Sequence, residues 1–146
     1  MIASRIDRPE SDPNPGPGGG QVVRARRATL DEVPALVRLR GLIPAEVGVE
    51  TGVPDAPWRT ASAEWFAERL RHPGVFAAFL VDDPALGVVS SAAGTCDRHA
   101  PGPAILSGLQ GHVSNVSTGP RRRRLGHARI CLDALLGWFR EEAGSR

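Results

Sequence analysis

The stretch that decides the fold is residues 113–139, VSNVSTGPRRRRLGHARICLDALLGWF, near the end of a chain of 146 residues. Its first part predicts a β-strand over residues 109–118, and its last part predicts an amphipathic helix that begins near Gly126. The apolar residues of this helix recur at helical spacing, at Ala128, Cys131, Leu132, Leu135, Leu136 and Phe139. Four consecutive arginines, at positions 121–124, separate the two elements. The stretch therefore predicts a strand, a basic loop and a helix.

The basic loop predicts a binding site for an anion. The first turn of a helix carries unpaired backbone N–H groups and a partial positive charge, so it favours bound anions. Four arginines beside a helix start are unfavourable unless an anionic ligand compensates their charge. Taken alone, the arginine run also fits a solvated basic patch. Together with Gly126 and Ala128, it favours a ligand that carries phosphate.

The composition narrows the class of protein. A formal net charge of +2 does not suggest a protein coated with nucleic acid. No apolar run approaches the ~20 residues of a membrane span, and the N-terminus lacks the apolar run of a signal peptide. Cys96 and Cys131 follow no pattern, which fits a reducing compartment. We expect a cytoplasmic protein without a membrane partner. Residues 1–20, rich in proline and glycine, are expected to form a disordered tail.

The remaining elements follow from periodicity and from turn residues. We predict strands over residues 21–27, 75–81 and 86–95, helices over 31–40 and 60–71, and a loop over 41–57. The resulting order, β-α-α-β-β-β-α, indicates a mixed α/β layer fold.

Three local features refine this prediction. The first helix starts either with a capping box between Thr29 and Glu32 or with Asp31 as N-cap, and the sequence leaves both open. Thr60 or Ser62 is the expected cap of the second helix. In the last strand, a bulge near residues 114–115 would place Val113 and Val116 on one face, although they lie three residues apart.

These features resemble the GNAT superfamily of acyl-CoA N-acyltransferases. Its signature after the fourth strand reads Arg/Gln-x-x-Gly-x-Gly/Ala, often with a proline three residues before the arginine. The matching residues here are Pro120, Arg123, Gly126 and Ala128. Arg124 departs from the family pattern, because many members carry glycine there. The resemblance covers about residues 22–142 and is strongest over 115–136.

The resemblance implies a mixed, largely antiparallel sheet with helices on both faces. It also implies transfer of acetyl from acetyl-CoA to a primary amine of a small molecule or peptide, by direct attack on the thioester and without a metal. A diphosphate would lie on the N–H groups of residues 124–128, and Arg121 or Arg122 would reach the ribose phosphate. Residues 116–118 would pair with the pantetheine arm and polarise the thioester carbonyl. The implied cofactor-binding residues are Val116, Ser117, Thr118, Arg121, Arg123, Arg124, Leu125, Gly126, His127 and Ala128.

No catalytic residue is assigned. Glu46, Glu50 and Asp55 lie in the loop that shapes the amine site in the family, but each also fits a surface carboxylate. His112 and His127 are expected to be structural or solvent-facing. Cys131 is expected to be a buried small residue and not a nucleophile. Three tryptophans are expected to pack in the core or in a lid, namely Trp58, Trp65 and Trp138.

The family normally continues past the last helix, often with a tyrosine that acts as the acid, and this chain contains no tyrosine. We therefore expect residues 21–146 to form a GNAT-like domain that lacks the last strands and helix. We also expect the isolated chain to be unstable, dimeric or poorly active. One alternative is a catalytically impaired remnant that binds acyl-CoA or depends on a partner chain. Another is a nucleic-acid-binding module, which the near-neutral charge disfavours.

Overall fold

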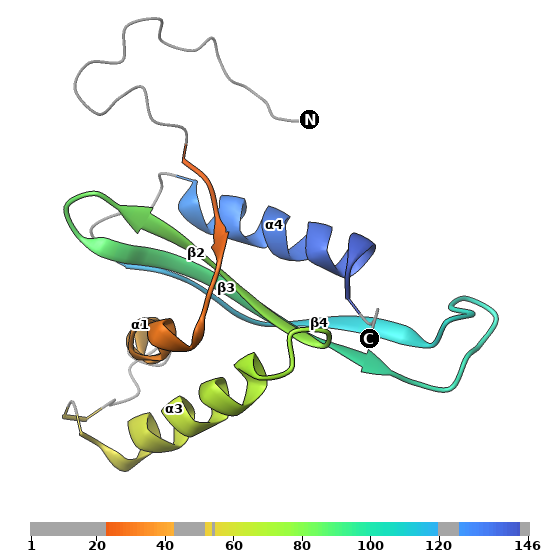
Figure 1. Cartoon of the computed structure of the whole chain (residues 1–146), viewed down its shortest axis with the longest axis horizontal. Coiled ribbons are helices and arrows are strands. Elements are labelled where there is room, and N and C mark those ends of the chain that lie inside the picture. The colour runs from red at the N-terminus through yellow and green to blue at the C-terminus, as the bar shows by residue number, and fades with distance from the viewer. Residues whose placement is uncertain (1–22, 43–51, 54, 120–125, 144–146) are drawn as a thin grey trace, which may run out of the picture.

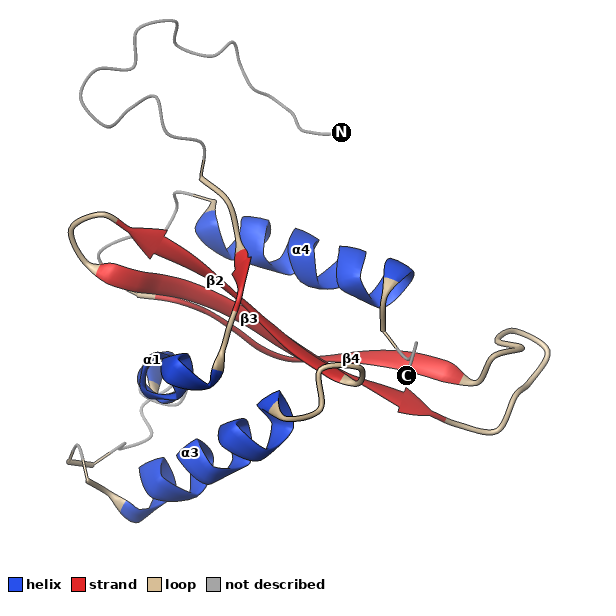
Figure 2. Ribbon diagram, in the orientation of Figure 1, coloured by secondary structure: helices blue, strands red, loops and turns tan. Residues whose placement is uncertain are grey.

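A four-stranded antiparallel sheet with helices on both faces forms the centre of the molecule (Figures 1 and 2). The computed structural model describes residues 23–42, 52–53, 55–119 and 126–143. The elements are β1 (Arg26–Arg27), the 3-10 helix η1 (Leu30–Glu32), α1 (Val33–Arg40), α3 (Pro57–Leu70), β2 (Phe76–Asp83), β3 (Gly87–Arg98), β4 (Leu109–Thr118) and α4 (His127–Glu141). The strands lie in the order β1-β2-β3-β4. The predicted element order and the mixed α/β class are confirmed.

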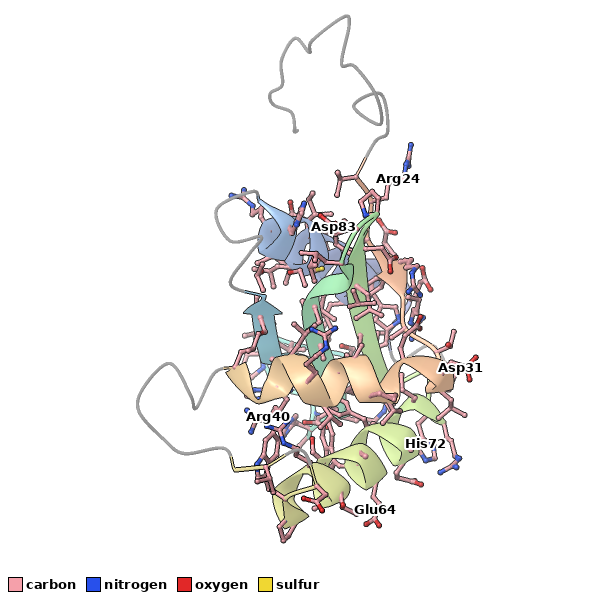
Figure 3. All side chains as sticks on the ribbon, turned by 90° about the vertical axis from the view of Figure 1, so that its left-hand side faces the viewer. Arg24, Asp31, Arg40, Glu64, His72 and Asp83 are labelled. Atoms are coloured by element: carbon pink, nitrogen blue, oxygen red, sulfur yellow. The ribbon has the colours of Figure 1, made fainter. Side chains whose placement is uncertain are left out.

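The sheet separates two hydrophobic clusters, because successive side chains of a strand point to opposite faces. Phe76, Ala78 and Leu80 of β2 pack with α1 and α3. Ala77 and Val81, on the opposite face, pack with α4. Figure 3 shows α1 and α3 on one side of the strands and α4 on the other. Coverage of both faces explains why the β2 sequence is continuously apolar and does not alternate.

The start of the first helical segment carries a capping box. The backbone N–H of Thr29 donates to Glu32 Oε1 at 2.7 Å, and Thr29 is the N-cap of η1. The same carboxylate, through Oε2, lies 2.6 Å from Arg26 Nη2, while Arg26 Nε lies 2.6 Å from Asp82 Oδ2. The bond to Arg26 is the main cause that lowers the pKa of Glu32. This network ties β1, η1 and β2 together at the sheet edge.

Some predicted boundaries were wrong. Asp31 is not an N-cap, because the box at Thr29 starts η1 and Glu32 is the N-cap of α1. α3 begins at Pro57, so Thr60 and Ser62 lie inside the helix and do not cap it. Proline at the first helical position loses no hydrogen bond, and its fixed φ favours the helix. Of the strand predicted over residues 21–27, only Arg26–Arg27 is a strand in the described part.

The predicted bulge in β4 is confirmed. Asn115 lies opposite Ala93 and Val113 lies opposite Gly94, so Ser114 is the extra residue. Val116 lies opposite Ala92. Because Ala92 and Gly94 are two residues apart on β3, their partners Val113 and Val116 lie on one face of the sheet. The bulge thereby turns the Ser114–Asn115 region toward α1 and α3.

None of the described helices is long and apolar enough to span a membrane.

Candidate functional site

The end of β4 presents backbone groups at a sheet edge. No described strand pairs with β4 on the side away from β3. The Gly119 N–H donates to Val89 O at 2.7 Å, which continues the ladder with β3. In an antiparallel ladder, alternate residues direct their N–H and C=O groups to the same neighbour. Ser117 therefore also faces β3, and the backbone of Val116 faces the outer edge.

The side chain of Ser117 has a structural role in this region. Its hydroxyl donates to Leu39 O at 3.0 Å and is buried. Its carbonyl accepts a bond of 2.9 Å from Ser90 Oγ, which also lies 2.9 Å from Thr118 Oγ1. These bonds hold the end of β4 against α1 and β3, and they leave the outer edge of Val116 in a fixed position.

The start of α4 is an open helix N-terminus. Gly126 is the N-cap, with φ 80° in the left-handed region, and Ile130 N–H donates to its carbonyl at 3.0 Å. No side chain of a described residue caps the helix, and its first turn contains no acidic residue. A Cβ built on Gly126 would meet no atom within 4 Å. The first N–H groups of the helix, starting at His127, therefore carry the partial positive charge that favours an anion.

The predicted cofactor-binding residues fall into three groups. Val116, Ser117 and Thr118 lie at the end of β4, and Gly126, His127 and Ala128 lie at the start of α4. The remaining four lie outside the described residues, namely Arg121, Arg123, Arg124 and Leu125.

The two histidines differ in their surroundings. The His127 side chain is buried, and its Nδ1 has no hydrogen-bond partner in the described part of the chain. His112 is exposed on β4.

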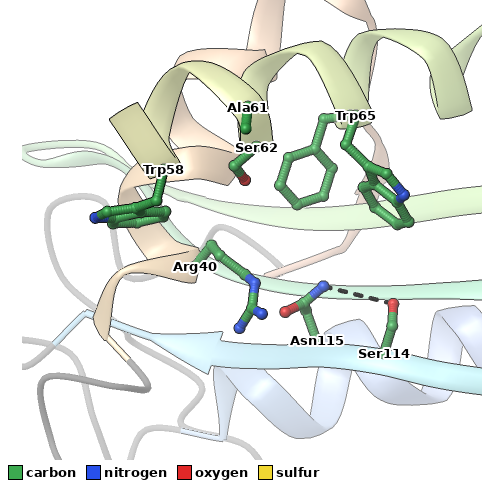
Figure 4. Close-up of a pocket in the computed structure, with 8 residues that line it drawn as sticks. Arg40, Trp58, Ala61, Ser62, Trp65, Ser114 and Asn115 are labelled. Atoms are coloured by element: carbon green, nitrogen blue, oxygen red, sulfur yellow. Dashed lines mark hydrogen bonds between the residues drawn. The ribbon is translucent and has the colours of Figure 1, made fainter. Parts of the chain in front are cut away.

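A cavity of about 470 Å³ lies where the β4 bulge faces the helices (Figure 4). It is lined by two tryptophans, a phenylalanine and several polar side chains: Arg40, Trp58, Ala61, Ser62, Trp65, Phe66, Ser114 and Asn115. The volume lies within the range of small-molecule sites. No carboxylate or imidazole occurs among these residues. Nor do the described residues contain a group of three or more potential metal ligands.

Asn115 forms the polar floor of this cavity. Ser114 Oγ donates to Ala93 O at 3.1 Å and accepts a long bond of 3.5 Å from Asn115 Nδ2. The hydroxyl proton is used by the bond to Ala93 O, so Ser114 Oγ can only accept from the amide, and the Nδ2 of Asn115 is the atom turned toward it. Asn115 Oδ1 is buried, and no residue in the described part of the chain forms a hydrogen bond with it. Figure 4 shows Arg40 pointing toward this side of Asn115.

Sequence reasoning did not single out Arg40 or Asn115. They come from α1 and β4, and only the folded chain brings them together beside α3. Trp138 is buried in the core, as expected, whereas Trp58 and Trp65 line the cavity. Asp55, one of the considered carboxylates, is exposed, and Glu46 and Glu50 lie outside the described residues.

Comparison with known proteins places this geometry in a fold family. No protein-family profile and no curated protein matches the sequence. Among solved structures, a predicted acetyltransferase with acetyl-CoA from Clostridium acetobutylicum matches with a TM-score of 0.69 and 20% identity, over 82% of this chain and 75% of that one. A GCN5-related N-acetyltransferase from Ralstonia eutropha matches with a TM-score of 0.68 and 16% identity, over 82% and 77%.

A third solved structure is an aminoglycoside acetyltransferase from an uncultured soil metagenomic sample, in complex with sisomicin. It matches with a TM-score of 0.58 and 13% identity, over 83% of this chain and 72% of that one. At these identities the likeness concerns the fold. Together with the strand–loop–helix arrangement at β4 and α4, it gives one conclusion: the chain has the fold of the GCN5-related N-acetyltransferases.

Proposed function

We propose that this chain is an N-acetyltransferase that moves an acetyl group from acetyl-CoA to a primary amine. One observation carries the proposal: α4, whose start at Gly126 has no side-chain cap among the described residues, is the next described element after β4, and no described strand covers the outer edge of β4. A helix start suits a diphosphate, and a free strand edge suits an extended arm with amide groups. The acetyl-CoA in the Clostridium acetobutylicum structure of the same fold supports this assignment.

The proposed position of acetyl-CoA follows the two elements. The diphosphate lies on the N–H groups of Gly126, His127 and Ala128, where Gly126 has no Cβ to obstruct the approach. Arg121, Arg123, Arg124 and Leu125, in the segment before α4, complete the phosphate site, with guanidinium groups as charge-assisted partners.

The pantetheine arm runs along the outer edge of β4. It pairs there with the backbone of Val116, with Thr118 two residues further on. Ser117, whose side chain already bonds Leu39 O, contributes by holding the strand. An arm that starts at α4 and follows this edge extends toward the bulge at Ser114. The thioester at its end therefore lies near the cavity.

The reaction proposed here needs no covalent enzyme intermediate. The lone pair of the amine nitrogen attacks the thioester carbonyl carbon, a C–N bond forms and the C–S bond breaks. The amine loses one proton, and the departing thiolate gains one. An outward N–H group of β4 stabilises the oxygen of the tetrahedral intermediate. No carboxylate or imidazole lies among the described residues that line the cavity, so the proposal assigns no general base.

The same observation favours a second candidate, a chain that binds acyl-CoA with impaired catalysis. Both candidates predict that acetyl-CoA raises the melting temperature of the full chain. They differ in turnover, since only the enzyme releases free coenzyme A thiol when acetyl-CoA is mixed with a panel of primary amines. Thiol release above the rate without amine supports the enzyme. A melting shift without thiol release for any amine supports the remnant, and no melting shift contradicts both.

A further inference from the structure

We propose that the cavity beside the β4 bulge takes an aromatic α-amino acid as the acceptor, with its carboxylate on Arg40 and its amino group on Asn115. This inference rests on the proposed function, because it assigns the acceptor of that reaction. Three observations support it: a cation at the cavity wall, an unpaired buried acceptor at its floor, and aromatic side chains around them.

The floor of the cavity requires a hydrogen-bond donor. Asn115 is 9% exposed, its Nδ2 is turned toward Ser114 Oγ at 3.5 Å, and its Oδ1 has no hydrogen-bond partner among the described residues. An unpaired buried amide oxygen is costly, so a ligand that supplies an N–H gains by satisfying it. An amino group is such a donor. This contact places the reacting nitrogen next to the bulge, where the proposed arm of acetyl-CoA ends.

The wall of the cavity supplies a positive charge. Arg40 is exposed at the end of α1 (Figure 3). It forms no hydrogen bond or ion pair with any of the described residues. Its neighbour Arg38, by contrast, donates to Val88 O at 2.8 Å and lies outside the cavity. A guanidinium recognises a carboxylate with two parallel bonds. The charge of Arg40 would repel a simple ammonium ion, so an acceptor that also carries a carboxylate is favoured over a plain amine.

The aromatic residues of the cavity lining indicate which kind of side chain the bound amino acid carries. Trp58 and Trp65, with the buried Phe66, come from one side of α3 and surround the space above Asn115 (Figure 4). Trp65 is 42% exposed, and its ring meets those of Phe66 and Phe76 in edge-to-face contacts, with centroids 5.3 and 5.7 Å away. Flat aromatic groups pack well against such rings, edge to face or offset. An aromatic side group therefore fits this wall better than a charged one.

Calorimetric titration of the full chain with phenylalanine and with phenethylamine, which lacks the carboxylate, tests the proposal. Each titration is run with and without saturating coenzyme A, so that binding does not depend on turnover. We expect phenylalanine to bind at least about tenfold more tightly than phenethylamine. Arg40→Gln should remove this preference, and Arg40→Lys should restore part of it. Arg38→Gln removes the same charge from the same helix and should keep the full preference.

Thermal unfolding of each variant shows that it is folded. The proposal is overturned if the wild-type chain binds the two ligands equally or does not bind phenylalanine. It is also overturned if Arg38→Gln loses as much of the preference for phenylalanine as Arg40→Gln does. Its failure is distinct from failure of the proposed function. If acetyl-CoA binds but the carboxylate preference is missing, only the acceptor assignment is wrong. If phenylalanine binds through Arg40 but acetyl-CoA does not bind, the acetyl-transfer function is wrong and the amino-acid site stands.

Discussion

Cys131 shows how burial decides the chemistry of a single side chain. It lies on the apolar side of α4, fully covered between the helix and the sheet, as the helical spacing predicted. Burial raises the pKa of its thiol to about 11, against a smaller opposing effect of the hydrogen bond with Ser90. The thiolate is the reactive form, so this cysteine is unsuited to nucleophilic catalysis at neutral pH.

This burial predicts slow labelling of Cys131 in the folded protein. At pH 8, iodoacetamide should modify Cys131 at least about a hundredfold more slowly in the native protein than in urea, because the thiolate is scarcer and covered. Peptide mass spectrometry distinguishes it from Cys96. Because the folded-state pKa is raised, the stability contribution of this thiol is complete below its unfolded pKa of about 8.5. It is lost as the pH rises toward 11. Equal labelling rates in both states would contradict this account.

At the scale of elements, α4 sits closely on β3 and β4 because glycines leave room for Phe139. A Cβ at Gly111 would lie 2.8 Å from two ring atoms of Phe139, and a Cβ at Gly94 would lie 2.8 Å from a third. Real Cβ atoms do not approach this closely, so any side chain there must move the ring or the helix. The position of the proposed ligand site at the start of α4 depends on this packing of the helix against the sheet.

Substitution of Gly111 tests the contact between sheet and helix. Gly111→Ala should lower the free energy of unfolding by about 1–3 kcal/mol, as overpacking does. Phe139→Leu in the same chain should recover part of the loss, which a double-mutant cycle in urea measures. Gly102→Ala, where the added Cβ meets no atom within 4 Å, is the matched control and should cost little. If Gly111→Ala is as stable as wild type, the close contact is wrong.

For the whole molecule, the features predicted from sequence are those that depend on local patterns. The spacing of Val113 and Val116 predicted a bulge, and the bulge is present at Ser114. The order of the strands and helices also followed from local periodicity. The start of α3 was misplaced because polar caps were expected at Thr60 or Ser62, whereas Pro57 begins the helix through its fixed φ.

The cavity could not be predicted in this way, because its lining depends on long-range packing. Arg40, Trp58 and Asn115 come from three elements, and no local pattern relates them. The orphaned oxygen of Asn115 likewise depends on Ser114 and on the β3 carbonyl of Ala93. The sequence motif pointed to the end of the site that would hold phosphate, and the acceptor end that we propose lies in the cavity at the bulge.

The central claim is that the start of α4 and the edge of β4 bind acetyl-CoA. The most direct test is calorimetric titration with acetyl-CoA of the wild-type chain, Gly126→Ala and Gly87→Ala. The two glycines have nearly the same φ, 80° and 79°, and an added Cβ meets no atom within 4 Å at either. Gly87, however, lies at the start of β3 and not at a helix start.

Both substitutions should therefore lower the free energy of unfolding by a similar ~1–2 kcal/mol, because each strains the backbone. Only Gly126→Ala places a Cβ where the diphosphate approaches. We predict saturable binding of one acetyl-CoA per wild-type chain, the same affinity for Gly87→Ala, and an affinity at least about tenfold weaker for Gly126→Ala. The account would be contradicted if acetyl-CoA did not bind saturably to the wild-type chain. It would also be contradicted if the two variants lost the same amount of affinity for acetyl-CoA.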